Sequence, residues 1–236
     1  HESKTLPLAN ITQIIPPQPF VEDLLWEGNL DAKLNIERDD DKVDDWRLKL
    51  DTTLSHGRWR HKFDGSQRHE TKNGNKIKDE WEASYDQDYF LTDQWFLRGS
   101  AGTDRDQFDT VERQDAVGFG PGYSFWNNAL GHFELIGQLD HYELQTEDDV
   151  YRFEASSMQW DYKRLLWGTR FEFVSTGEFA APHVDSIDYV LDSDIGLRYR
   201  INEWARVSLL YELNQVRGAS QTSSDRDYTL GVGVGW

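Results

Sequence analysis

The 236-residue sequence contains no cysteine, six prolines and no apolar run that approaches the length of a membrane-spanning helix. The absence of cysteine excludes a disulfide scaffold and a thiolate metal site. A membrane helix needs about 20 apolar residues in succession, so any membrane role must use strands or the molecular surface. Positive charge is also scarce, because 25 Lys and Arg stand against 43 Asp and Glu and the net charge is −18. This balance argues against nucleic-acid binding, which depends largely on cationic neutralisation of phosphate.

Aromatic residues, in contrast, are abundant, and the chain ends on one of them. The final ten residues, DYTLGVGVGW (227–236), alternate strictly, as in a strand with one apolar and one nearly bare face. An apolar strand at a chain end needs an apolar environment and a neighbour to pair with, and a closed barrel provides both. The terminal pattern resembles the signal that outer-membrane proteins present to the barrel assembly machinery. Its positions are Tyr228, Leu230, Val232, Val234 and Trp236.

The same alternation recurs along the whole chain. In WEGNLDAKLNIER (26–38) and WRLKLDTTL (46–54) nearly every second residue is apolar, and the two segments read as a hairpin around the acidic DDDK (39–42). Further candidate strands lie near 57–64, 76–86, 94–103, 115–125, 131–143, 150–160, 163–174, 188–201, 204–214 and 226–236. The sequence therefore predicts an all-β fold, an antiparallel up-and-down barrel of about twelve strands.

The period alone does not say which face of the barrel is apolar, because a soluble barrel turns its apolar face inward. Here the polar face carries bulky charges of both signs on nearly every strand, and the strand ends are rich in Trp, Tyr and Phe. A lipid-facing barrel has an apolar band between aromatic girdles, and its lumen can hold paired charges. We therefore expect a transmembrane β-barrel over residues 23–236, in contact with lipid and lipopolysaccharide of a Gram-negative outer membrane.

Turn lengths predict the orientation of this barrel. On the side of the first hairpin turn, the connections near 64–75, 104–114, 144–149, 175–187 and 215–226 read as long and polar. On the other side, SHGR (55–58), DYK (161–163) and NEW (202–204) read as short turns. Because outer-membrane barrels have short periplasmic turns and longer extracellular loops, both termini are expected in the periplasm. The start at His1, without methionine, fits removal of a signal peptide.

Several stretches together resemble the YdiY-like family of salt-induced outer-membrane proteins, which carry a domain of unknown function. The resemblance runs from about Leu25 to Trp236. It is carried by WEGNLDAKLNIE, by YFLTDQWFLRGSAGTDRDQFDTVERQDAVGFGPGYSFW, by IGLRYRINEWARVSLLYELN and by the ending YTLGVGVGW. The resemblance implies an outer-membrane barrel and assigns no biochemical activity.

Charged residues on the inner face are the candidate functional residues. Barrels of about eight strands fill their interior and those of 16–18 hold a water channel, so about twelve strands predict a narrow lumen. A pore for small polar solutes or ions and a structural filling of ion pairs are both consistent with this composition. The residues expected in the lumen are Lys33, Arg47, Lys49, Arg60, Glu80, Glu82, Glu134, Asp140, Arg170, Asp192, Asp194, Arg198, Arg200, Arg206 and Glu212.

A catalytic role is the alternative, and it requires a serine nucleophile with a histidine base on the lipid-facing rim, within hydrogen-bonding reach. On a single strand, the two-residue spacing of a known barrel lipase type occurs only at His1-Glu2-Ser3. His61 and His141 are expected to face lipid, and neither has a serine two positions away. We therefore expect no catalytic residue, although partners on neighbouring strands leave a hydrolase open.

Loop residues offer a weaker signal for chemistry. An acidic protease site would draw on Asp104, Asp106, Asp109, His183 and Asp185, and any solvated loop contains such residues. The acidic runs 39–41 and 147–149 lack the glycine-punctuated loop of a calcium site. The sequence thus predicts neither a metal nor a cofactor.

The segment HESKTLPLANITQIIPPQPF (1–20) differs from the rest, because Pro16, Pro17 and Pro19 disfavour a central strand. We expect residues 1–22 to form an N-terminal periplasmic extension. Its ordinary interpretation is a loose leader. The alternative is a segment that binds a periplasmic or envelope protein, which would make the barrel a structural anchor.

Overall fold

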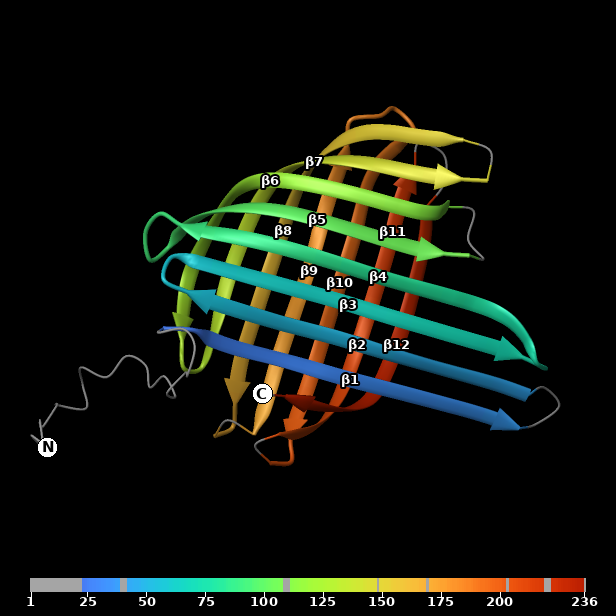
Figure 1. Cartoon of the computed structure of the whole chain (residues 1–236), viewed down its shortest axis with the longest axis horizontal. Coiled ribbons are helices and arrows are strands. Elements are labelled where there is room, and N and C mark those ends of the chain that lie inside the picture. The colour runs from blue at the N-terminus through green and yellow to red at the C-terminus, as the bar shows by residue number, and fades with distance from the viewer. Residues whose placement is uncertain are drawn as a thin grey trace, which may run out of the picture.

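The computed structural model describes residues 23–38, 42–107, 111–147, 149–168, 170–202, 204–218 and 222–235. Within them, twelve antiparallel strands form one closed barrel in which each strand pairs with its neighbours in sequence (Figure 1). The strands are β1 (Leu25–Arg38), β2 (Lys42–His56), β3 (Trp59–Lys72), β4 (Asn75–Phe90), β5 (Trp95–Asp106), β6 (Val111–Asn128), β7 (Gly131–Thr146), β8 (Val150–Leu166), β9 (Phe171–Pro182), β10 (Ile187–Arg200), β11 (Ala205–Gly218) and β12 (Thr222–Gly235). The predicted all-β, twelve-stranded antiparallel barrel is confirmed, and the described part of the chain contains no helix able to cross a membrane.

The first and last strands close the barrel. Residues Asn29–Ala32 of β1 pair with Val232–Gly235 of β12, whereas β1 pairs with β2 along its whole length. The apolar C-terminal strand therefore has the neighbour that its sequence requires. Of the predicted assembly signal, Tyr228, Leu230 and Val232 lie exposed on the outer face and Val234 follows them, while Trp236 lies outside the described residues. The N-terminal segment 1–22 also lies outside them, so its partner-binding role stays a prediction.

The connections between strands are shorter than the sequence predicts. All of them span two to four residues, at both ends of the barrel. The expected long loops were wrong because pairing continues beyond the apolar part of each strand: Asp64–Lys72 belong to β3 and pair with both β2 and β4. The apolar alternation fades there, since polar residues occupy both faces, but the backbone ladder does not.

One predicted turn lies inside a strand. Asp161, Tyr162 and Lys163 pair with β7 on one side and β9 on the other, and β8 turns only after Leu166. The turn is made by Trp167 and Gly168, which have the positive φ values of 46° and 73°. Glycine adopts positive φ values without steric cost, so Gly168 is a turn signal in the sequence. The prediction of a turn at residues 161–163 overlooked it.

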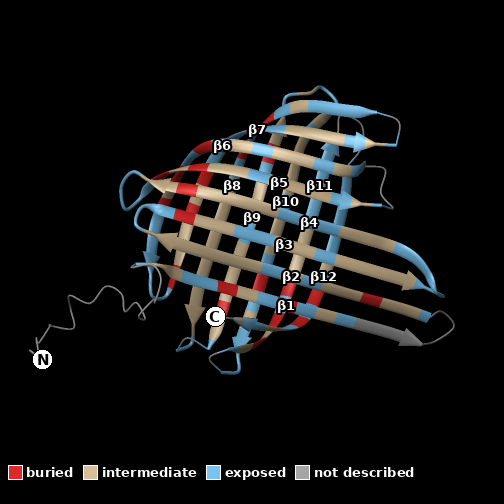
Figure 2. Ribbon diagram, viewed as in Figure 1, coloured by how far each residue is buried: buried red, intermediate tan, exposed pale blue. Residues whose placement is uncertain are grey.

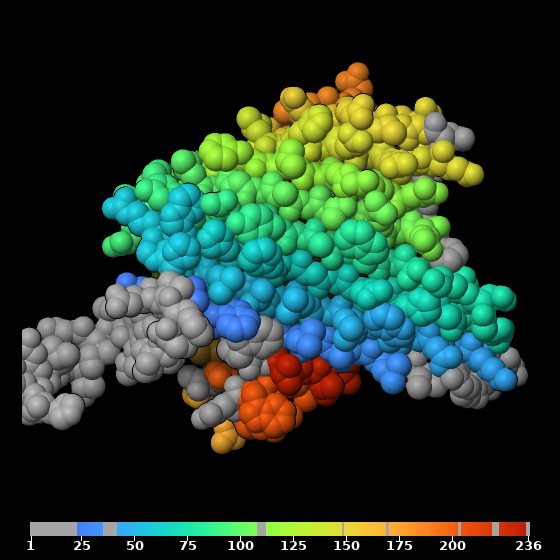
Figure 3. Space-filling model, in the orientation of Figure 1, coloured from blue at the N-terminus to red at the C-terminus, as the bar shows by residue number. Residues whose placement is uncertain are grey.

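The outer face of the barrel carries exposed apolar residues, and exposed positions alternate with buried ones most clearly in β7, β8 and β11 (Figure 2). Successive strands from β1 to β8 pack side by side into a continuous wall on the viewed face (Figure 3). Such an outward apolar surface suits the hydrocarbon core of a bilayer and would be costly in water. Its exposed members include Leu30, Leu48, Leu50, Val117, Phe119, Leu139, Met158, Ile195, Leu197, Leu209, Leu230 and Val232.

Aromatic side chains border this band at the end of the barrel where β1 begins and β12 ends. Rings on β5 to β9 contact one another in a continuous series with centroid distances of 4.9–6.0 Å. The series runs through Trp95, Tyr123, Phe125, Phe133, Tyr162 and Phe173. Aromatic rings at this level are typical of the interface between hydrocarbon and headgroups.

If the outer face contacts lipid, placing a charged side chain on it should lower the free energy of unfolding, and the loss should be larger within the apolar band than at its edge. Leu209 lies between Leu197 and Leu230 on the neighbouring strands, and all three side chains are exposed. Leu209→Arg should lower the free energy of unfolding by about 2–4 kcal/mol, because the guanidinium would enter the centre of the apolar band. The control Val150→Arg, at the end of β8, should cost about 0–1 kcal/mol. Urea titrations in lipid vesicles measure both, and equal costs would contradict a lipid-facing band.

Candidate pore lumen and its ion pairs

The inner face of the barrel carries charged side chains on nearly every strand. Arg60 of β3 contacts Glu134 of β7, four strands away, so the side chains on this face point into the barrel. The alternation places these predicted lumen residues on the same face: Lys33, Arg47, Lys49, Arg60, Glu80, Glu82, Glu134, Asp140, Asp192, Asp194, Arg198, Arg200, Arg206 and Glu212. Arg170 is different, because it lies in the turn between β8 and β9 and is exposed. β9 begins only at Phe171, so the lumen position of Arg170 stays a prediction.

A first group of ion pairs crosses the lumen from β3. Lys62 Nζ lies 2.6 Å from Asp161 Oδ2 of β8, and in barrel order these strands are separated by four strands on one side and six on the other. Arg60 donates two parallel hydrogen bonds of 2.8 and 2.7 Å to the carboxylate of Glu134. Its Nε also donates to Asp88, and both carboxylates are fully buried. Such bidentate pairs fix geometry as well as charge, so the lumen is bridged nearly across its diameter here.

A second group crosses the other half of the lumen. Lys49 Nζ of β2 lies 2.7 Å from Asp194 Oδ2 of β10, with β1, β12 and β11 between the two strands. Arg47 binds Glu212 and, at 3.0 Å, Asp227. These bonds reach between strands that do not touch through their backbones. The lumen is therefore narrow enough for single side chains to span it.

Arg198 continues this second group. Its Nη1 donates to Glu172 Oε1 at 3.1 Å, and its Nη2 lies 3.7 Å from Asp51 Oδ1 across the lumen. Arg206 is buried. It pairs in register with Arg200, which lies two residues after Arg198 on β10 and faces the same side of the sheet. The carboxylates of Glu172 and Asp51 offset the repulsion among the positive charges of these arginines.

Beside the first group, the lumen is filled by side chains. The ring of Phe96 is fully buried and lies against the guanidinium of Arg60, 5.1 Å from its centroid. The ring packs over Gly122, where a Cβ atom would collide with it. Gly122 thus makes room for an aromatic side chain, which fills the lumen at this level.

Solvent-accessible carboxylates line the lumen beyond the ion pairs. Asp192, Glu82 and Asp64 are inward-facing and exposed. Lys49 and Asp194 retain side-chain exposures of 34% and 33%, so water reaches the second group as well. The accessible side chains of this part of the lumen are therefore mostly carboxylates.

Two other predicted lumen residues have local partners. Glu80 Oε2 lies 3.0 Å from Lys78 Nζ on the same strand. Asp140 accepts a hydrogen bond of 2.5 Å from Ser157 and is buried. Lys33 lines a small cavity beside the β1–β12 junction, together with Arg47 and Thr229.

The described residues contain no group of three or more His, Asp or Glu side chains arranged to hold a metal ion. A polar pair that the sequence reasoning missed lies on the outer rim: Ser156 Oγ and His183 Nε2 are 3.0 Å apart. The two residues are 27 positions apart, and only the register between β8 and β9 brings them together. A search for serine and histidine on one strand misses such a pair.

Comparison with known proteins supports the fold. No curated protein matches the chain in sequence. Among solved structures, the NanC porin aligns with a TM-score of 0.53 and 14% identity, covering 88% of this chain and 98% of that one. The translocator domain of the autotransporter NalP from Neisseria meningitidis gives a TM-score of 0.46 and 11% identity, covering 90% and 87%. The NanC match, together with the closed twelve-stranded sheet, shows the fold of an outer-membrane β-barrel.

The family is shown by the sequence itself. Residues 32–236 match the family described as "Protein of unknown function, DUF481". This match supports the domain of unknown function that the sequence resemblance implied, while the YdiY-like name stays a prediction. The match takes in all twelve strands except the start of β1, and with it both groups of lumen ion pairs. The chain accordingly belongs to the DUF481 family.

Proposed function

We propose that this barrel lies in the outer membrane, with its termini in the periplasm, and forms a narrow charged pore for small polar solutes or ions. The observation that supports the proposal is the water-accessible charge in the lumen: Lys49 and Asp194 keep side-chain exposures of 34% and 33%, and the inward carboxylates of Asp192 and Glu82 are exposed. A structural core would be served as well or better by apolar side chains, because buried ion pairs stabilise weakly relative to hydrophobic packing. Mixed charges in contact with water are instead what a selective aqueous path requires.

The acidic excess sets the expected selectivity. The Debye length at 0.1 M salt is about 10 Å, so charges on the wall act across a narrow lumen. Accessible carboxylates such as Asp192 and Glu82 concentrate cations there and exclude anions. We infer a pore that prefers cations or positively charged and neutral polar solutes.

Conductance of the purified full chain in a planar bilayer tests this proposal. We expect reproducible current steps with a reversal potential that indicates cation preference under a KCl gradient. Asp192→Asn combined with Glu82→Gln should move the reversal potential toward zero, because both inward carboxylates lose their charge. The control Glu143→Gln, outward on β7, should leave it unchanged. A folded barrel that gives no steps would contradict the pore.

A further inference from the structure

The Ser156–His183 pair lies on the outer surface, outside the lumen, at the border between the lipid-facing band and the polar rim. On β8, Ser156 is followed outward by Met158 and preceded by Glu154, so the surface changes from apolar to charged at this residue. Leu139 pairs with Ser156 on β7, and its side chain is 68% exposed. The serine hydroxyl is therefore at the depth where the ester groups of membrane lipids meet their acyl chains.

The geometry of the pair is that of a nucleophile with its base. Ser156 Oγ lies 3.0 Å from His183 Nε2, within the range in which an imidazole takes the hydroxyl proton. Both residues are exposed, so the hydroxyl is open to a substrate.

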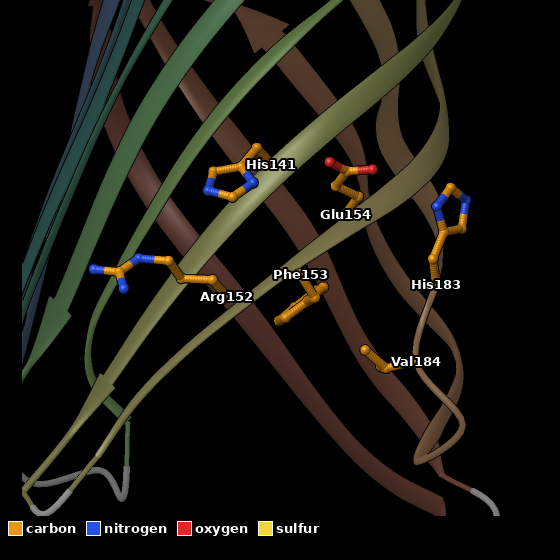
Figure 4. A pocket seen from close by; sticks show the side chains of 6 residues that line it. All are labelled: His141, Arg152, Phe153, Glu154, His183 and Val184. Atoms are coloured by element: carbon orange, nitrogen blue, oxygen red, sulfur yellow. The ribbon is translucent and has the colours of Figure 1, made fainter.

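A shallow pocket lies beside the pair. It has a volume of about 330 Å³, and it is lined by His141, Arg152, Glu154 and His183 among others (Figure 4). Glu154 pairs in register with His141, and its backbone carbonyl accepts a hydrogen bond of 2.7 Å from the backbone N–H of His183. The Glu154 carboxylate thus lies between two histidines on one outward row.

We propose that Ser156 and His183 form the catalytic pair of an interfacial esterase that hydrolyses carboxylic esters of membrane lipids. Ser156 Oγ bonds to the ester carbonyl carbon as its proton passes to His183 Nε2. The carbon–oxygen bond to the alcohol then breaks, and the alcohol leaves with that proton. Water next attacks the acyl-serine with His183 as base, which releases the fatty acid and returns the proton to Ser156. Met158 and Leu139 provide the apolar surface along which the acyl chain lies.

This activity is independent of the pore, because the pair faces lipid while the ion pairs face the lumen. Glycerophospholipids and lipid A both carry acyl esters at the boundary between headgroups and acyl chains. The experiment therefore tests each of the two lipids separately as a substrate. The refolded full chain is supplied in mixed micelles with each lipid in turn, and fatty acid release is measured. A fluorophosphonate probe, which labels activated serines, reports the nucleophile by mass spectrometry.

We expect fatty acid release from at least one of the two lipids and probe attachment at Ser156. Ser156→Ala should abolish both, and His183→Ala should lower turnover by about 10²- to 10⁴-fold, the usual contribution of a general base. Ser193→Ala, a control serine that also faces outward on β10, should retain full turnover. Circular dichroism confirms that each variant is folded.

Two results would overturn the proposal. The first is a folded wild-type barrel that releases no fatty acid from either lipid. The second is turnover or labelling that persists in Ser156→Ala, which would place the activity in another residue or in a contaminant. Conductance measured on Ser156→Ala separates this outcome from failure of the pore, since the variant leaves the lumen unaltered.

Discussion

Glu134→Ala should lower the free energy of unfolding by about 3–5 kcal/mol, the cost of leaving a buried charge without its partner. Glu134 is fully buried, and it is held by two hydrogen bonds from Arg60, with Lys62 Nζ 4.0 Å away. Its removal leaves the guanidinium of Arg60 with Asp88 alone in a part of the lumen that side chains fill. Urea unfolding in detergent micelles, followed by tryptophan fluorescence, measures the loss.

A control on the same strand separates burial from charge. Glu143 binds Arg152 at 2.8 Å on the outer rim, where the two side chains are 41% and 59% exposed. Glu143→Ala should therefore cost at most about 1 kcal/mol. Replacing both partners, as in Arg60→Met with Glu134→Leu, should cost less than Glu134→Ala alone, because no unpaired charge remains. Equal losses for Glu134→Ala and Glu143→Ala would show that water screens the inner pair.

Gly120→Ala should also destabilise the barrel strongly, by about 3 kcal/mol. The glycine lies on the inner face of β6 beside Pro121, where β7 approaches closely. An added Cβ would collide with the carbonyl oxygen of Gly137 and lie 2.8 Å from Gln138 Cα. Overpacking against a flexible side chain costs about 1–3 kcal/mol, and here the obstacle is backbone, so the two strands must move apart.

Gly99→Ala is the matched control for this change. Gly99 lies on the neighbouring strand β5, faces outward, and has open space where a Cβ would be added. Its replacement should leave stability unchanged or raise it by up to about 1 kcal/mol, because alanine restricts the unfolded chain. The same unfolding titration compares the two variants. A Gly120→Ala barrel as stable as Gly99→Ala would contradict the close approach of β6 and β7.

The sequence predicted the two faces of the barrel but not the partners within it. The alternation put Lys49 and Asp194 on the inner face, because the side-chain period of a strand is two wherever it pairs. Nothing in the sequence says that they meet, since that depends on the register of every strand between them. The Ser156–His183 contact was missed for the same reason. The predicted DYK turn lies inside β8, because the chain turns only after Leu166.

Strand ends were the least predictable part of the fold. Apolar alternation reports contact with lipid, not backbone pairing, so it ends where a strand passes out of the apolar band. The residues of β3 beyond Asp64 continue the sheet with polar side chains on both faces. The residues predicted as long loops are therefore the parts of the strands that extend beyond the apolar band.

The short junction between β1 and β12 sets the order of events in folding. Hairpin pairing joins residues that are near in sequence, whereas the junction joins Asn29–Ala32 to Val232–Gly235, about 200 positions away. Closing a loop of that size costs conformational entropy, and four residue pairs among the described residues offset that cost. The curved sheet should consequently exist as an open intermediate before it becomes a cylinder. A barrel built in this way depends on two strands to complete it, and these strands lie about 200 residues apart in the sequence.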